Sequence, residues 1–319
     1  MMRNRYLPVP RHQQRLPGPV RGLCALLLAV LFACSREGPE PTSKPSPEDK
    51  AGPAPSVEFE LPVLDDADYR FIASRIALNE TGGLERHLTH WGAGEDFPSF
   101  GIGHFIWFPA GVDAPFDESF PALVTYLEQT AADEATMPGW LERRFREQGV
   151  DFDAPWPDKQ SFDEALDSDS MLELRSWLAA TAPQQARFIA WNFVTRWNAL
   201  ELSAREKETL TRLLQQLVET PQGLFAVIDY VNFKGLGTNP RERYDGRGWG
   251  LLQVLNDVAA AREPNDEPRD LVRRFSEAAA SRLRDRVALS PPARNEARWL
   301  EGWIERVSQY PGSGAGEPG

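Results

Sequence analysis

Apolar positions recur at helical spacing over most of the chain between residues 61 and 310, which predicts a mainly helical domain. The first helix is expected where Tyr69, Ile72 and Ile76 share one face. It should end at Gly82, because glycine readily adopts the left-handed backbone conformation found just beyond helix C-termini.

Capping patterns and periodicity predict further helices. Helix starts are expected at two serines that precede a glutamate by three residues, and at two prolines suited to a first turn: Ser161, Ser203, Pro138 and Pro221. A stripe of large apolar side chains typical of a core contains Phe188, Ile189, Phe193 and Trp197. Residues 268–289 and 293–307 add two amphipathic helices.

One segment departs from helical spacing. Residues 99–109, SFGIGHFIWFP, alternate between two sets of side chains, which is the period of a β-strand. The preceding HWGAGEDFP carries the Gly and Asp of a turn. We therefore expect a mainly α fold with one small β-hairpin after the first helix.

Composition changes at the N-terminus, where residues 1–33 are typical of an export signal. Five arginines without an acid precede the apolar run LCALLLAVLFA, which is too short to span a bilayer permanently. The run ends in LFAC, which resembles a bacterial lipoprotein cleavage box and would make Cys34 a lipidated N-terminus anchored in a membrane. Ser35, in place of Asp, then favours the outer membrane, at its periplasmic face. The alternative is an ordinary cleaved secretory signal.

Residues 34–60 are expected to form a Pro-rich, disordered tether, because residues 35–57 lack aromatic side chains and cannot bury enough surface to fold. The folded domain is expected over residues 61–310, followed by a disordered tail at 311–319. The only other cysteine, Cys24, lies in the signal, so no internal disulfide is expected.

The charge of the chain argues against nucleic-acid binding. The net charge is −12, and removal of the five signal arginines brings it to about −17, which repels phosphate backbones. His87 and His90 lie three residues apart near Glu85, but no third convincing metal ligand accompanies them. No cofactor is therefore expected.

Glu80 is the leading candidate for catalysis. It lies at the expected end of the first helix, where unpaired carbonyl groups disfavour a carboxylate and should raise its pKa. A carboxylic acid that stays protonated near neutral pH can donate a proton to a leaving glycosidic oxygen. The alternative is an exposed residue at a helix end.

A helix that ends in Glu80 and is followed by SFGIGH resembles the phage-type lysozymes, in which a Glu at a helix end precedes a hairpin with a Gly-Ile-Gly-His run. The resemblance covers residues 72–104. It implies that Ser99 helps to position water and that His104 supports the hairpin. Residues 95–107 would then line a sugar groove, with Gly101, Gly103, His104 and Trp107 as substrate contacts.

The sequence also departs from that family. Ala93 stands where the phage enzymes carry a second carboxylate, and Glu95 and Asp96 are nearby substitutes. Direct hydrolysis uses such a second carboxylate to activate water. Lytic transglycosylases, of the same superfamily, use a single Glu, and GRGWGLLQVL resembles their Gly-Leu-Met-Gln segment, with Gln253 as the counterpart.

The loop NFKGLGTNPRERYDGRGWG concentrates positive charge in an acidic protein. Its cations and aromatic side chains are Lys234, Arg241, Arg243, Arg247, Tyr244 and Trp249. Aromatic planes can stack on sugars, and cations can bind the carboxylates of peptidoglycan, so Arg243, Tyr244 and Trp249 are candidate substrate contacts. The alternative is a solvated loop.

These patterns lead to the expectation of a lipid-anchored, lysozyme-like enzyme that cleaves peptidoglycan between N-acetylmuramic acid and N-acetylglucosamine. Whether it is a lytic transglycosylase or a muramidase stays open. Two other readings remain: a non-catalytic module that binds peptidoglycan or scaffolds the envelope, and an unrelated helical lipoprotein.

Overall fold

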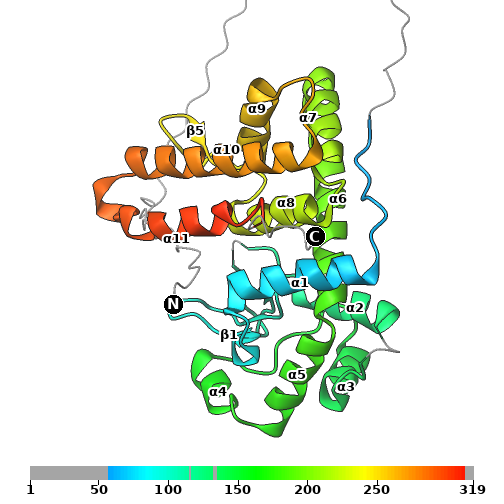
Figure 1. Ribbon diagram of the computed structural model, residues 1–319. Helices are drawn as coiled ribbons and strands as arrows, with labels where there is room; N and C mark the ends of the chain where they lie inside the picture. The colour runs from blue at the N-terminus through cyan, green and yellow to red at the C-terminus, as the bar shows by residue number, and fades with distance from the viewer. Residues whose placement is uncertain (1–56, 115, 132–134, 313–319) are drawn as a thin grey trace, which may run out of the picture. The chain divides into compact units, whose positions relative to one another are not determined.

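Eleven α-helices and two small antiparallel sheets make up the described part of the chain, residues 57–114, 116–131 and 135–312 of a computed structural model (Figure 1). The prediction of a mainly α fold is confirmed. The predicted signal, Cys34 and nearly all of the predicted tether and tail lie outside the described residues.

The helices alternate with short connections. The first six are α1 (Asp66–Thr81), α2 (Phe120–Thr130), α3 (Gly139–Gln148), α4 (Lys159–Glu164), α5 (Asp169–Ala180) and α6 (Ala182–Asn198). The others are α7 (Ala204–Leu217), α8 (Pro221–Lys234), α9 (Leu251–Ala261), α10 (Pro268–Leu289) and α11 (Ala297–Ser308). Helix α1 packs on α6 and α8, while α10 packs on α8, α9 and α11 (Figure 1).

Helix boundaries test the capping predictions. Ser203 caps α7 by accepting the N–H of Glu206 at 3.3 Å, as predicted. Gly82 ends α1 at φ 64°, also as predicted. The helix start at Ser161 is wrong, because Asp158 caps α4 and accepts the N–H of Ser161 at 2.8 Å. The aspartate three residues upstream therefore serves as the N-cap in place of the serine.

The large apolar stripe on α6 lies in the core, as predicted, with Trp197 fully buried and Phe188 and Phe193 almost so. Phe193 packs edge-on against Phe59, at a ring-centroid distance of 5.5 Å. This contact holds the segment before α1 against α6.

The predicted strand over residues 99–109 is a tight hairpin instead of one continuous strand. Three two-residue strands form an antiparallel sheet in the order β1 (Thr89–His90), β2 (Ser99–Phe100) and β3 (Phe105–Ile106). Residues 101–104 turn the chain between β2 and β3, with φ 70° at Gly101 and 50° at His104. The alternation in the sequence arises because this turn lies between two short, buried strands.

Gln185 on α6 fastens this turn to the helical core. Its Oε1 accepts the N–H of Ile102 at 2.9 Å, and its Nε2 donates to the carbonyl of Leu178 at 2.7 Å. Gln185 is fully buried, so both bonds form away from water. Gln185 therefore helps to hold the hairpin beside α6, together with the packing of Phe105 on Phe188.

We expect Gly101→Ala to destabilise the domain by about 1–3 kcal/mol. A Cβ at Gly101 would lie 2.3 Å from the Oε1 of Gln185. The alanine would also have to adopt the residue's φ of 70°, which L-residues rarely do. Gly111 is the matched control, since it has φ 77° but nothing within 4 Å of its Cβ position. Urea unfolding should show a larger loss for Gly101→Ala than for Gly111→Ala. Equal losses would mean that backbone strain alone accounts for the effect.

A second hairpin lies in the arginine-rich loop. Strands β4 (Arg243–Tyr244) and β5 (Arg247–Gly248) pair across Asp245 and Gly246, which have φ 47° and 76°. Two positive φ angles in a two-residue Asp-Gly loop are typical of the turns that match the twist of a β-hairpin.

Candidate active site

Glu80 is buried near the C-terminal end of α1, with 2% of its side chain exposed. The guanidinium Nη2 of Arg306 donates to its Oε1 at 2.5 Å, and Asn232 Nδ2 donates to the same oxygen at 3.1 Å. His104 Nδ1 lies 3.8 Å from its other oxygen, Oε2. The structure thus brings the predicted acid and the histidine of the GIGH run together.

Arg306, on α11, joins Glu80 to a second buried carboxylate. Its Nε and Nη2 donate to the two oxygens of Asp229, at 2.9 and 2.7 Å. Tyr310 Oη donates to Asp229 Oδ2 at 2.7 Å, and Asn79 Nδ2 donates to Oδ1 at 3.1 Å. We call this group the Glu80 cluster; its members are Asn79, Glu80, Asp229, Asn232, Arg306 and Tyr310.

The charges of the Glu80 cluster do not balance when both carboxylates are ionised. Two negative charges then share the single positive charge of Arg306. A proton on Glu80 would neutralise the group. The cluster can therefore take up one proton without breaking the two bonds between Arg306 and Asp229.

The predicted rise in the pKa of Glu80 is wrong in direction. Burial raises this pKa, but the charges of Arg306 and His104 and the hydrogen bonds from Arg306 and Asn232 together lower it below its ordinary value. The rise was expected from the carbonyl groups at the end of α1 alone. Arg306 lies 226 residues away in the chain, so no local pattern could reveal it.

The lowered pKa of Glu80 predicts a specific loss of stability in acid. Ionised Glu80 stabilises the fold at a pH above about 4.3, its pKa in the unfolded chain, and this contribution is lost as the pH falls through the lower folded pKa. Melting temperatures of the wild type and Glu80→Gln, measured from pH 7 to pH 3, should therefore converge as the pH falls. A gap that stays constant over this range would contradict the prediction.

The turn at residues 101–104 lies tightly against its neighbours. A Cβ at Gly103 would lie 2.7 Å from the Phe105 ring, so a larger residue there would displace that ring. The rings of His104 and His90 stack with their centroids 6.4 Å apart. Gly101 and Gly103 thus serve the close packing that places His104 beside Glu80, and their predicted contact with substrate stays a prediction.

The two other predicted catalytic residues lie on the sheet and its preceding turn. Ser99 is buried as the first residue of β2. Glu95 turns back on its own loop, where its Oε2 accepts the N–H of Gly92 at 2.9 Å, while Asp96 is exposed. This contact is possible because Gly92 has no Cβ, which would lie 2.3 Å from that oxygen.

Trp107 lies in the core and not on the surface of a groove. It was predicted to contact substrate, but it is fully buried and its indole N–H donates to the carbonyl of Phe152 at 2.7 Å. Its ring packs among Phe100, Phe120, Phe152 and Trp156. Trp107 is therefore part of the core beneath the sheet.

The loop between α8 and α9 is ordered by its own polar contacts. Gln253 accepts the N–H of Gly250 at 2.9 Å and donates to the carbonyl of Gly237 at 3.1 Å. The oxygen and the nitrogen of this amide thus both form hydrogen bonds within the loop. Arg243 is exposed, and Arg247 pairs with Asp285 at 3.0 Å.

The two predicted aromatic contacts of this loop pack together. Tyr244 and Trp249 have ring centroids 4.9 Å apart, and Tyr244 Oη donates to Glu296 at 2.9 Å. Arg286 forms two hydrogen bonds to Glu296, at 2.8 and 3.0 Å, and lies 4.3 Å from the centre of the Trp249 ring. Trp249 is almost fully buried, so Tyr244 is the more accessible of the pair.

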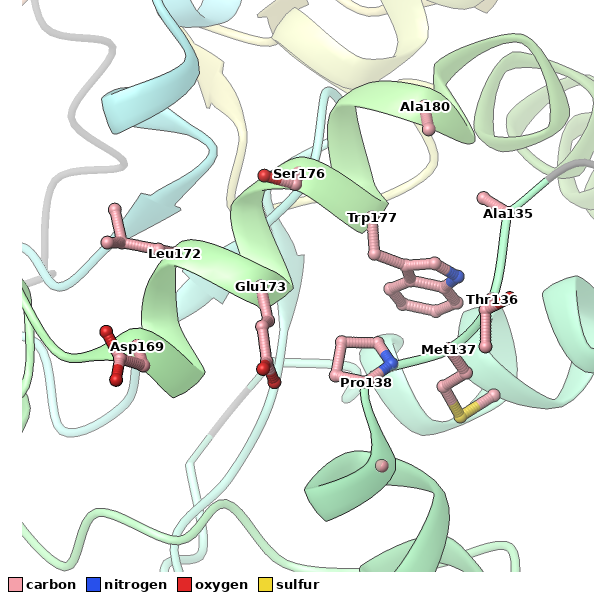
Figure 2. A pocket seen from close by; sticks show the side chains of 11 residues that line it. Ala135, Thr136, Met137, Pro138, Asp169, Leu172, Glu173, Ser176, Trp177 and Ala180 are labelled. Atoms are coloured by element: carbon pink, nitrogen blue, oxygen red, sulfur yellow. The ribbon is translucent and has the colours of Figure 1, made fainter.

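Two cavities in the described part of the chain lie away from Glu80. One, of about 780 Å³, is formed where Trp177 and Glu173 on α5 face Met137 and Pro138 (Figure 2). The other, of about 580 Å³, lies between α9 and α10. Neither is lined by Glu80 or by the residues that bond to it.

Comparison with protein-family models, curated proteins and solved structures finds no match to this chain. Within residues 57–114, 116–131 and 135–312, no group of three or more His, Cys, Asp or Glu side chains is placed to hold a metal ion. Over the same ranges, every helix is too short or too polar to cross a bilayer.

Proposed function

We propose that this protein cleaves the glycan strands of peptidoglycan between N-acetylmuramic acid and N-acetylglucosamine, with Glu80 as the acid and base. The observation that carries this proposal is the setting of Glu80, which is 2% exposed and lies 3.8 Å from the histidine of the GIGH turn. Buried carboxylates with charged partners are concentrated in functional sites. The resemblance to lysozymes in the order of helix, Glu and hairpin adds to this support.

The charge of the Glu80 cluster is compatible with both halves of such a reaction. Ionised Glu80, which its lowered pKa favours, can act as the base. For the acid step Glu80 must first be protonated, and Arg306 can then keep its two hydrogen bonds to Asp229. The positive charge of Arg306 therefore stays compensated in either state of Glu80.

Within this proposal we favour the lytic transglycosylase route, which needs one acidic residue. In that route Glu80 protonates the leaving oxygen and then deprotonates the muramic acid's own hydroxyl, which closes an anhydro ring. Glu95, the substitute for a second carboxylate, already accepts a hydrogen bond from Gly92 within its own turn. A muramidase would need Glu95 or Asp96 to leave its present position and activate water.

The proposed location agrees with this substrate. A lipid on Cys34 and a tether over residues 34–60 would hold the domain at the periplasmic face of the outer membrane, within reach of the wall. Lipidation can be tested by the mass of the protein recovered from membranes, with Cys34→Ser as the control.

The second candidate is a non-catalytic module that binds peptidoglycan or scaffolds the envelope. The lowered pKa of Glu80 favours it, because an ionised carboxylate paired with Arg306 can be a purely structural group. The enzyme and a peptidoglycan-binding module both predict glycan binding, but only the enzyme produces new chain ends.

The test is to digest purified peptidoglycan with the protein and to determine the masses of the soluble products. Anhydro-muramic ends would identify a transglycosylase, and reducing ends would identify a hydrolase. Binding of the wall without release of fragments would favour the non-catalytic module.

A further inference from the structure

A row of cations and aromatic rings extends from the Glu80 cluster toward the β4–β5 hairpin. We call it the cation–aromatic row; its members are Arg306, Phe233, Lys234, Trp303, Arg286 and Trp249. Arg306 lies 4.5 Å from the centre of the Phe233 ring, and Lys234 Nζ lies 3.7 Å from the same centre. The partner of Glu80 and the ammonium group of Lys234 thus both contact the same phenyl ring.

The three cations of this row differ in how their charge is compensated. Arg306 pairs with Glu80 and Asp229, and Arg286 pairs with Glu296. Lys234 Nζ, by contrast, contacts only ring faces, those of Phe233 and of Trp303 at 3.6 Å. Within the residues that the structure describes, it makes no hydrogen bond within 3.5 Å and has no carboxylate oxygen within 4.0 Å.

Such an ammonium group is costly to keep half-buried. Ring faces attract a cation, but they accept none of its three N–H bonds in the way that an oxygen does. Burial lowers the pKa of Lys234 well below its usual range, and the charges of Arg286 and Arg306 lower it further, against the opposing effect of Glu296 and Glu242. An anion bound here would supply both the missing acceptor and the missing charge.

The identity of the anion follows from the position of Lys234. Lys234 lies over the same phenyl ring as Arg306, which donates to Glu80, so Lys234 is one ring away from the Glu80 cluster. In peptidoglycan, the group that distinguishes the two sugars is the lactyl side group of muramic acid. It ends in a carboxylate or continues into a peptide that carries carboxylates.

We propose that Lys234, with the ring faces of Phe233 and Trp303, forms a subsite that binds a carboxylate of the muramyl side group or of its peptide. The subsite lets the protein select acidic wall glycan over neutral polymers of N-acetylglucosamine. This proposal rests on the proposed substrate, but it does not require that the bond be cleaved. It also replaces the loop arginines, of which Arg247 is already paired, as the principal carboxylate ligand.

The test measures binding with Glu80→Gln as the parent protein, so that turnover does not interfere. The two probes are soluble wall glycan strands with free peptide carboxylates and the same strands with these groups converted to methylamides. Calorimetric titration should show that amidation weakens binding to the parent about tenfold or more. In the parent that also carries Lys234→Met, both probes should bind with the weaker affinity.

Two controls separate charge at this position from general effects. Lys159→Met removes an exposed lysine on α4, and it should leave the preference for free carboxylates intact. Lys234→Arg keeps the charge and should retain most of that preference. Methionine can pack on the same two rings, so the melting temperature of Lys234→Met should be no lower than that of its parent.

The outcomes distinguish this inference from the proposed function. If Lys234→Met keeps the full preference for free carboxylates, or if the parent shows none, the subsite is refuted even when the wild type cleaves peptidoglycan. If the wild type releases no fragments but the Lys234-dependent preference is present, the subsite stands and the enzymatic proposal fails. If neither probe binds to the parent, the subsite is refuted, and fragment release by the wild type still decides the proposed function.

Discussion

Glu80→Gln is expected to reduce the release of peptidoglycan fragments by about 10²–10⁴-fold, the usual contribution of a general acid or base. Glutamine keeps the shape of the side chain and can still accept a hydrogen bond from Arg306 or Asn232. It cannot give or take the proton that the reaction needs. The measurement is the rate at which soluble muropeptides appear from purified wall.

The domain should still fold after this change at neutral pH, although with a lower melting temperature than the wild type. After Glu80→Gln, Arg306 is still compensated by Asp229, and the buried pair becomes neutral overall. Glu85→Gln is the control, since Glu85 is an exposed carboxylate a few residues further along the chain. Unchanged fragment release by Glu80→Gln, with wild-type activity in Glu85→Gln, would exclude Glu80 as the catalytic group and leave the non-catalytic module.

The same assay separates the two catalytic routes. A one-acid mechanism predicts that Glu95→Gln keeps most activity, because Glu95 then serves only its bond to Gly92. A large loss in Glu95→Gln, together with reducing ends in the products, would identify a hydrolase instead.

Arg306→Met is expected to destabilise the domain by about 3–5 kcal/mol, the usual result of removing one partner of a buried ion pair. The change leaves two carboxylates, Glu80 and Asp229, without their shared cation, and both side chains are 2% exposed or less. Urea unfolding at pH 7 would measure the loss. Arg298→Met, on the exposed face of the same helix, should change stability by about 0.5 kcal/mol or less.

A charge-neutral variant tests the cause of this effect. Adding Glu80→Gln and Asp229→Asn to Arg306→Met removes both stranded carboxylates, and it should restore most of the lost stability. If the triple variant is as unstable as Arg306→Met alone, lost packing of the arginine against Phe233 would be the cause instead.

Local patterns predicted the elements well but placed the site only in part. Periodicity and capping identified α1, α7 and the last two helices, because these signals lie within a few residues of each other. They also led to Glu80 and His104, which the structure brings together. They failed for Ser161, because Asp158 caps the helix instead. They also failed for Trp107, because alternation along a strand does not show whether a side chain is buried or exposed.

The partners of Glu80 were missed for a different reason. Asp229 did leave a signal, since it is the only charged residue in the mostly apolar run LFAVIDYVNF, and a lone charge within a buried helix needs a partner. The sequence does not say which of many arginines that partner is. Lys234 was noticed as one cation of a basic loop, but only the structure shows that ring faces replace its acceptors.

The wide separation of Glu80 and Arg306, 226 residues apart, also bears on how the protein reaches its working form. During synthesis the helix with the glutamate emerges long before the helix with the arginine, so the acid cannot be enclosed until almost the whole domain has been made. An unfinished or clipped chain would expose this acid to water and lack its surroundings. Under the proposed function, the capacity to cleave the wall would then arise only in completed molecules.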